Sequence, residues 1–288
     1  MTNEFVSAPV SAALVSRAKR YLRGLTDPIR YRLRLHFQPR HNHIYTQFYR
    51  FPSQLAVLVE HVLPKLLAER PPTPEAPLEV AVFACCSGEE AYTLAYVLAT
   101  RAPGVPIRVR GYDIVPELVA QAKLGSYARE HVYSSPFMTD ELAASLFDGS
   151  GEMLTVKPQF ASLTSFEVGD ITDAVAMSRL PRADLLFAQN VLFHLPRPVA
   201  KRAFENLVGG LRPGGAFFVN GMDTDMRARL TVQHGLEPVI QRITEIHEEA
   251  RVDRGANWAG SYWGREPLKM SGDWVRKYFT IYNKKSSA

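Results

Sequence analysis

Cysteine is almost absent from this chain of 288 residues, since only Cys85 and Cys86 occur and they are adjacent. Neighbouring cysteines rarely form a disulfide and do not make a metal-binding constellation, so we expect a reducing, cytoplasmic compartment and no metal site. The sequence also lacks an apolar run of about 18 residues, the length that a membrane-spanning helix requires. Its first residues lack the basic leader of a signal peptide. These absences argue against the secreted and membrane-spanning classes of protein.

A strong excess of one charge is missing as well. The net charge is +5 at pH 7 and the isoelectric point is near 9.2, which alone does not indicate nucleic-acid binding. The charge is uneven, because eight basic residues and one acid, Asp27, lie between Arg17 and Arg40. This segment is either a solvated helical face or a docking surface for an acidic partner. No nucleic-acid motif accompanies it, so we do not expect a nucleic-acid substrate.

Proline divides the chain. Four prolines occur in the seven residues 71–77, and they cannot continue the helical pattern that precedes them. We therefore predict a small N-terminal helical domain over residues 1–70, a linker over 71–77, and a catalytic domain with a C-terminal extension over 78–288.

Short apolar segments alternate with helical patterns after the linker. The segments predicted as strands are residues 80–83, 107–112, 165–168, 183–190, 216–220 and 278–282. This alternation predicts a Rossmann-like, doubly wound α/β sheet, largely parallel, which binds ligands beyond the carboxyl ends of its strands. Four residues fall at those ends: Ala84, Asp113, Asp170 and Asn190. Residues 127–157 show less regularity, residues 211–215 predict a turn, and residues 239–251 predict a helix.

The segment after the first predicted strand, ACCSGEE, indicates the type of cofactor. Small residues let a nucleoside approach the backbone, and Asp113 can accept hydrogen bonds from both ribose hydroxyls. A dinucleotide fingerprint would be GxGxxG, whereas this turn lacks two of the glycines. Glu89 and Glu90 would repel a pyrophosphate at the helix start but suit a positively charged cofactor without phosphate. S-adenosylmethionine, with its ammonium and sulfonium, meets this requirement, and a dehydrogenase is the least favoured class.

Five ordered motifs resemble the chemotaxis-receptor glutamate methyltransferases of the CheR type. FACCSGEEAYTLA, residues 83–95, is similar to the first motif of that family, SAGCSTGEEPYSLA. The other matches are TQFYR at 46–50, YDI at 112–114 with AKLGSY at 122–127, NVL at 190–192 and RPGG at 212–215. The resemblance therefore covers roughly residues 45–221.

The resemblance implies a binding site for S-adenosylmethionine. Arg50 would pair with the methionine carboxylate and take part in catalysis. Glu89 would hold the ammonium and Asp113 the ribose, while Asp170 and Ile171 would lie beside the adenine. The full set, in which Asn190 and Val191 line the methionine side, is Thr46, Arg50, Ala84, Glu89, Asp113, Ile114, Asp170, Ile171, Asn190 and Val191.

Each of these assignments has a purely structural alternative. Arg50 could be an ordinary surface arginine, and Glu89 a carboxylate that suits the helix dipole. Asp113 could be a strand-end acid, and Asp170 and Asn190 could be turn residues.

Departures from the family pattern bear on the methyl acceptor. Ala84 stands where the family has glycine, Gln189 where it has arginine, and His194 where it has an active-site tyrosine. A glutamate acceptor is already anionic at neutral pH, whereas an amine, phenol or carbon acid must lose a proton. We hypothesise that His194 is a catalytic base for such an acceptor, against the alternative of a packing or hydrogen-bonding histidine.

The chain also extends beyond the usual end of that family's domain, from Met222 to Ala288. Trp258, Tyr262 and Trp263 in this extension form either core or a pocket for a planar or apolar substrate. No segment gives a clear equivalent of the small β-subdomain that assists receptor docking in the family.

We predict an S-adenosylmethionine-dependent methyltransferase of CheR-like build, which methylates a protein glutamate or a small-molecule acceptor. The intact motifs and the basic segment favour the protein carboxylate, whereas Gln189, His194 and the extension favour a small molecule. The alternative from another class is a non-catalytic cofactor-binding sensor that docks an acidic partner.

Overall fold

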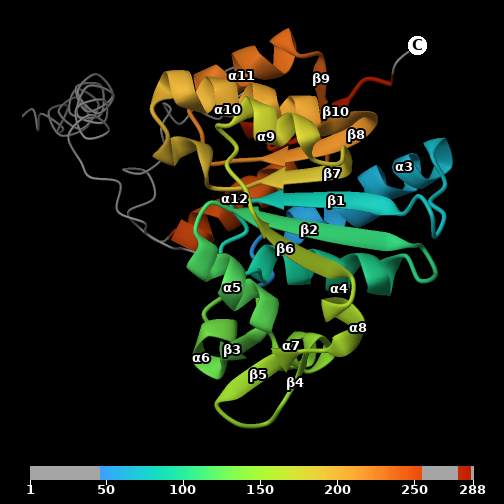
Figure 1. Ribbon diagram of the computed structural model, residues 1–288, viewed down its shortest axis with the longest axis vertical. Coiled ribbons are helices and arrows are strands. Elements are labelled where there is room, and N and C mark those ends of the chain that lie inside the picture. The colour runs from blue at the N-terminus through green and yellow to red at the C-terminus, as the bar shows by residue number, and fades with distance from the viewer. Residues whose placement is uncertain (1–45, 255–277, 287–288) are drawn as a thin grey trace, which may run out of the picture.

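The computed structural model describes residues 46–254 and 278–286, which form a sheet covered by helices on both faces (Figure 1). Within these residues the main sheet has seven strands. In their order across the sheet they are β6 (Thr164–Val168), β2 (Ile107–Asp113), β1 (Leu78–Phe83), β7 (Ala183–Ala188), β8 (Leu211–Val219), β10 (Ile281–Lys284) and β9 (Leu236–Pro238). The first five are parallel, and β10 runs antiparallel to both of its neighbours. This architecture confirms the predicted doubly wound α/β fold.

The central strand β1 explains why two layers of helices are needed. All six of its residues are buried, and neighbouring side chains of a strand point to opposite faces. Val80 and Val82 belong to one hydrophobic cluster, whereas Ala81 and Phe83 belong to the other. The main helices along the sheet are α4 (Glu89–Arg101), α5 (Pro116–Leu124), α9 (Ala174–Arg179), α10 (Arg197–Gly210), α11 (Thr224–Gln233) and α12 (Ile243–Arg254). Figure 1 shows α10 and α11 on one side of the sheet and α4 on the other.

The helix that precedes β1 packs in the same core as the sheet. It consists of α2 (Pro52–Val57), a π-helical turn η1 (Leu58–Val62) and α3 (Leu63–Glu69). Pro64 cannot donate a hydrogen bond and its ring crowds the preceding turn, which the π-helical turn accommodates. The apolar side chains of this helix join the cluster that includes β1 and α4. Residues 1–45 lie outside the described residues, so the division into domains stays a prediction.

A small antiparallel sheet lies below the main sheet in Figure 1 and corrects one expectation. It comprises β3 (Ser126–Ala128), β5 (Met153–Val156) and β4 (Phe147–Asp148), with α6 (Arg129–Val132), α7 (Asp140–Leu146) and α8 (Pro158–Ala161) around it. The expectation that this chain lacks a small β-subdomain is therefore wrong. Strands of two to four residues are too short to show the alternation that identifies a strand.

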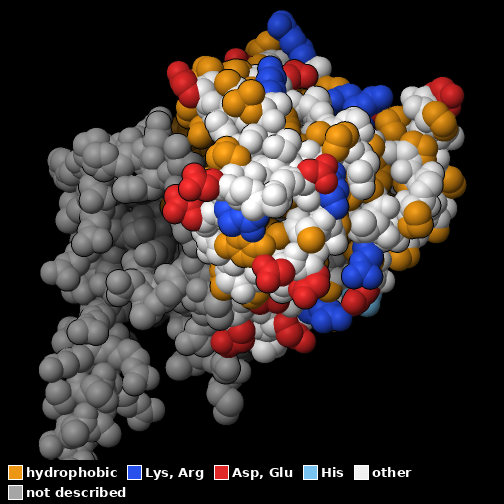
Figure 2. All heavy atoms as spheres, turned by 90° about the horizontal axis from the view of Figure 1, so that it is seen from below, with side chains coloured by type: hydrophobic (Ala, Val, Ile, Leu, Met, Phe, Trp, Pro, Cys, Tyr) orange, Lys and Arg blue, Asp and Glu red, His pale blue; other side chains and the backbone are white. Residues whose placement is uncertain are grey.

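On the face seen in Figure 2, acidic, basic and hydrophobic side chains are interspersed, so no single charge dominates this side.

Three further sequence boundaries differ in the structure. Residues 211–215, expected as a turn, are the irregular start of β8, where the register with β7 shifts between Ala183 and Leu185. The C-terminal helix begins at Ile243, and the last strand begins at Ile281. The aromatic residues Trp258, Tyr262 and Trp263 lie outside the described residues.

The described part of the C-terminal extension is bound into the domain. Strand β10 pairs with β8 and β9. Helix α12 places the Glu249 carboxylate at the start of α2, where it accepts from the Ser53 backbone N–H at 2.9 Å and from the Ser53 hydroxyl at 2.5 Å. A side-chain carboxylate at a helix start satisfies N–H groups that lack a partner within the helix. The extension therefore helps to fix the helix that follows Arg50.

Candidate functional site

The turn between β1 and α4 begins at the carboxyl end of the central strand. Ala84 and Cys86 adopt left-handed backbone angles, with φ of 53° and 50°, and Gly88 has φ of 99°. A Cβ atom at Gly88 would lie 3.1 Å from both the Ala122 Cβ and the Phe166 Cζ, so the turn favours glycine there. Left-handed angles at non-glycine residues cluster at functional sites, which identifies this turn as a candidate binding loop.

The two cysteines of this turn are not poised for nucleophilic chemistry. Burial, together with the neighbouring carboxylate of Asp113, raises the pKa of the Cys86 thiol to about 12. The same two causes raise the pKa of the Cys85 thiol. Both thiols stay protonated at neutral pH, and a protonated thiol is a poor nucleophile.

Glu89 is the most deeply buried carboxylate of the turn, with no exposed surface. Its Oε1 accepts from the Ser87 hydroxyl at 2.5 Å and lies 2.7 Å from Nε2 of His131. Its Oε2 accepts from the Thr46 hydroxyl at 3.1 Å. Two carboxylate oxygens offer about four acceptor positions, so one position remains on Oε2. The site thus holds a buried negative charge that can accept one more hydrogen bond.

The segment before α2 is anchored to α4 at two points. Thr46 reaches Glu89, and the backbone N–H of Tyr49 donates to the Thr93 hydroxyl at 3.1 Å. Arg50 follows directly, half-buried, with its guanidinium carbon 5.3 Å from the centre of the Phe51 ring. These bonds place Thr46 and Arg50 at the start of α4, beside the turn.

Asp113 closes the turn from the end of β2. It is 5% exposed, and its Oδ2 accepts from the Cys86 backbone N–H at 2.8 Å. Its Oδ1 accepts from the Val115 backbone N–H at 3.0 Å. Each oxygen therefore keeps one acceptor position. The next residue, Ile114, exposes 60% of its surface and provides an apolar wall beside this carboxylate.

Asp170 and Ile171 lie beyond the end of the neighbouring strand, β6. Asp170 is half-buried, and its Oδ1 accepts from both the backbone N–H and the hydroxyl of Thr172 at 2.7 Å. Ile171 is buried, and its carbonyl accepts from the Asn206 amide at 2.9 Å. The Asp170 side chain thus stabilises its own turn, while Oδ2 has no described partner.

The ends of β7 and β8 meet at Asn190. This residue has φ of 53°, and its backbone N–H donates to Oδ1 of Asn220 at 2.9 Å. A Cβ atom at Gly221 would lie 2.6 Å from the Asn190 Cα, so only glycine permits this approach. Val191 is half-buried beside it. His194 ends the short 3-10 turn η2 (Leu192–His194), where it is exposed and packs against Phe193 with ring centres 4.0 Å apart.

A polar network connects the end of β7 with α2 and with the residue before β10. The Gln189 amide donates to Oε1 of Gln54 at 2.5 Å, and the Gln54 amide donates to the Thr280 hydroxyl at 2.9 Å. Burial raises the pKa of Glu90 to about 7, although the charge of Arg50 and a hydrogen bond from Gln189 act in the opposite direction. The Glu90 carboxyl is therefore partly protonated near neutral pH.

Residues 45–232 match the family described as CheR methyltransferase, SAM binding domain. The chain belongs to the CheR methyltransferase family. The domain that this match covers is the S-adenosylmethionine-binding domain of the family, and it contains the turn, Glu89, Asp113 and Asn190.

Two relatives and one solved structure illustrate the similarity. The probable biofilm formation methyltransferase WspC of Pseudomonas putida is 31% identical over 199 residues, which are 67% of this chain and 44% of that protein. The chemotaxis protein methyltransferase 2 of Vibrio cholerae is 26% identical over 231 residues, 79% of this chain and 73% of that protein. The solved structure is magnesium protoporphyrin IX methyltransferase (ChlM) from Synechocystis PCC 6803 with bound SAM. The match covers 83% of this chain and 90% of that chain, with 15% sequence identity and a TM-score of 0.36. The chain spans less than half the length of the WspC relatives that it matches.

The described part of this CheR-family chain has neither a cluster of metal-binding side chains nor a membrane-spanning helix. Over residues 46–254 and 278–286, no three His, Cys, Asp or Glu side chains are grouped so as to hold a metal ion. No helix in the same ranges combines the length and the apolar character needed to cross a membrane.

The structure adds site residues that the sequence did not indicate. Ser87 and His131 bond to Glu89, and Asn220 bonds to the backbone of Asn190. Ser87 could have been suspected, because it lies within the first motif two residues before Glu89. His131 lies in the segment that showed no regular pattern, so no local signal could have placed it at this CheR-family site.

Proposed function

We propose that this chain is an S-adenosylmethionine-dependent methyltransferase that acts on a protein carboxylate in the cytoplasm. The observation that carries the proposal is the buried Glu89 carboxylate, which keeps one acceptor position on Oε2 beside a left-handed turn. A cationic group such as the methionine ammonium of the cofactor would satisfy both the charge and the remaining acceptor. The division into an N-terminal helical domain, a linker and a catalytic domain is part of the same proposal.

The donors and acceptors of the site fit this cofactor. Asp113 offers one acceptor position on each oxygen, which matches the two ribose hydroxyls. Ile114 offers an exposed apolar surface, and Ile171 with Asp170 borders the neighbouring strand end, where the adenine would lie. Asn190, Val191, Thr46 and Ala84 would complete the binding residues.

When bound, the cofactor supplies an electrophilic methyl group on sulfur, and the transfer is an in-line displacement. The protein then contributes mainly by positioning the reactants and excluding water. Arg50 would orient the methionine carboxylate by a charge-assisted pair.

A protein glutamate is the acceptor that this chemistry supports best. Its carboxylate is already anionic at neutral pH and needs no base. The Vibrio cholerae relative is named a chemotaxis protein methyltransferase, and the Pseudomonas putida relative a probable biofilm formation methyltransferase. The basic segment from Arg17 to Arg40 would dock an acidic protein, although it lies outside the described residues.

A second candidate is an acceptor that must lose a proton. Two titratable groups favour it: Glu90, whose pKa burial raises to about 7, and the exposed His194 beyond β7. The pH dependence of methyl transfer by His194→Gln would decide between the candidates. A loss of the acidic limb, where the rate falls as a base becomes protonated, would with a small-molecule acceptor favour a catalytic His194. An unchanged profile and rate would exclude that role.

The main test combines binding with product analysis. Calorimetry with S-adenosylhomocysteine should show saturable binding, and Glu89→Gln should weaken it by about 10- to 100-fold through loss of a charge-assisted bond. Glu117→Gln, in the exposed first turn of α5, is the matched control and should bind normally. Incubation of cell protein with cofactor labelled in the methyl group should give base-labile label, as a carboxyl ester requires. No heat with S-adenosylhomocysteine, together with firm uptake of a dinucleotide, would contradict the proposal.

A further inference from the structure

The small antiparallel sheet brings a histidine to the buried carboxylate of the cofactor site. His131 on α6 lies with Nε2 2.7 Å from Oε1 of Glu89, although 42 residues separate the two in sequence. Its ring is held between Tyr127, stacked at 6.0 Å, and Phe48, whose ring lies edge-on at 6.3 Å. About a third of the His131 side chain, 36%, is exposed, so the ring can exchange protons with water.

The geometry divides the two oxygens of Glu89 between two partners. Oε1 is fully used by Ser87 and His131, and Oε2 is used once, by Thr46. An incoming ammonium would therefore bind at Oε2, without displacing His131 from Oε1. A protonated His131 and an ammonium would then share a single negative charge in a buried setting, where charges are weakly screened.

We propose that His131 is a positioning residue which tunes the attraction of Glu89 for the cofactor ammonium, so that cofactor binding releases a proton from the His131 ring. The inference rests on the proposed function, since it takes the cofactor to be S-adenosylmethionine. Neutral His131 still donates a hydrogen bond to Glu89, whereas protonated His131 also neutralises it.

The sign of the coupling follows from the charges around the ring. The groups that face His131 are Glu89 from α4 and Tyr127 from β3, and Arg129 and Glu130 flank it on its own helix. Strand β5 contributes no titratable residue. In the free protein the hydrogen bond to Glu89 raises the pKa of His131, against partial burial. A bound ammonium would lower that pKa again, so affinity should rise with pH through the range in which free His131 loses its proton.

Calorimetry of S-adenosylhomocysteine binding between pH 6 and pH 8.5, in buffers of different ionisation enthalpy, measures both the affinity and the protons released. If cofactor binding lowers the pKa of His131 by one unit, the affinity at the high-pH end of the range should be about tenfold greater than at the low-pH end. We expect the wild-type protein to show such a rise and to release a fraction of a proton within this range.

His131→Gln keeps a neutral donor and cannot titrate, so it should bind like the wild type at pH 8.5 and lose the His131-dependent rise. His131→Ala lacks the donor and should bind more weakly than His131→Gln at every pH. His61→Gln is the matched control, because His61 also lies beside a carboxylate, 3.9 Å from Glu60, outside the site. It should keep the wild-type pH dependence.

A second measurement needs no variant to fold. The His131 ring proton signal, titrated by NMR in the wild-type protein, should give a lower pKa with S-adenosylhomocysteine than without it. An equal His131 pKa in the free and the bound protein, or equal proton release by His131→Gln and the wild type, would overturn the role of His131. Either result would leave the proposed function standing. A wild-type protein that binds no S-adenosylhomocysteine at any pH would contradict the proposed function as well.

Discussion

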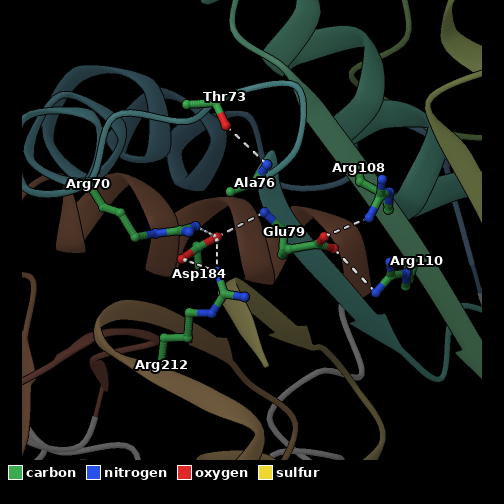
Figure 3. A network of polar contacts seen from close by, with 8 residues as sticks. All are labelled: Arg70, Thr73, Ala76, Glu79, Arg108, Arg110, Asp184 and Arg212. Carbon is green, nitrogen blue, oxygen red and sulfur yellow. Dashed lines mark hydrogen bonds and ion pairs between the residues drawn. The ribbon is translucent and has the colours of Figure 1, made fainter. Parts of the chain in front are cut away.

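The two ends of the parallel sheet neutralise their buried carboxylates in different ways. At the amino-terminal end, Asp184 and Glu79 are paired with arginines of the chain itself (Figure 3). Asp184 accepts from Arg70, from Arg212 at 3.3 Å and from the backbone N–H of Glu79 at 2.9 Å. Glu79 in turn pairs with Arg108 at 3.0 Å and Arg110 at 3.3 Å.

At the carboxyl-terminal end, Glu89 and Asp113 are held by hydroxyls, backbone N–H groups and one histidine. Within the described residues, neither forms an ion pair with a lysine or an arginine. A buried carboxylate without a permanent cation keeps its charge for a ligand, and the fold tolerates the cost through neutral hydrogen bonds. The comparison indicates that one end of the sheet is built for stability and the other for binding.

Removal of Asp184 should have the largest effect on stability. The Asp184 side chain is 4% exposed, and Asp184→Ala would leave Arg70 and Arg212 without their acceptor and the Glu79 N–H unsatisfied. Breaking a buried pair costs about 3–5 kcal/mol of unfolding free energy, and because the two arginines are partly exposed we expect the low end of that range, which urea denaturation measures. Asp184→Asn keeps an acceptor and should lose less. Since the site lies at the other end, S-adenosylhomocysteine affinity of the folded variant should be unchanged, and a loss of affinity would break the separation of the two ends.

Glu90 offers a smaller, pH-dependent test of the binding end. Burial raises its folded pKa from 4.5 to about 7, so the folded protein binds more protons than the unfolded chain between those values. Stability should therefore fall as the pH rises through that window and level off above it. The rise from 4.5 to about 7 corresponds to about 3 kcal/mol, but Glu90 is only half-buried, so we discount that value for solvent screening. Glu90→Gln lacks this loss, and we expect it to be more stable than the wild type by about 1–2 kcal/mol at pH 8. The difference in unfolding free energy between Glu90→Gln and the wild type should disappear near pH 4.5. Urea denaturation from pH 4.5 to pH 8 measures it, and a difference that stays constant with pH would contradict this explanation.

Local patterns predicted the sheet and its binding edge. The apolar run of β1, the GEE of the turn and the strand-end Asp113 are contiguous signals, because a turn and the ends of its strands are close in sequence. Those residues indicated the cofactor and the family, and the fold and the family are confirmed. The roles of individual residues such as Asp170, Asn190 and His194 stay predictions.

Long-range contacts could not be predicted from the same patterns. The bond between Gln54 and Thr280 joins residues 226 positions apart, and Ser53 meets Glu249 across 196 positions. His131 reaches Glu89 through a sheet whose strands are too short to recognise. Such contacts depend on how elements pack, and no periodicity within one element encodes them.

Glu79 tests whether the number of ion pairs or their burial stabilises the amino-terminal end. It makes two pairs, in which the Arg108 side chain is 47% exposed and the Arg110 side chain 18%. The Glu79 side chain itself is 11% exposed, against 4% for Asp184, so water competes more for the Glu79 carboxylate. Glu79→Gln should therefore reduce the unfolding free energy by only about 1 kcal/mol, although it breaks as many arginine pairs as Asp184→Ala. The difference between variant and wild type should shrink further in 1 M salt, where the Debye length is about 3 Å. Lys201→Gln, which breaks an exposed pair with Glu205 on α10, is the control for an ordinary surface pair. A loss at Glu79 as large as that at Asp184 would show that charge number, and not burial, governs this end of the sheet.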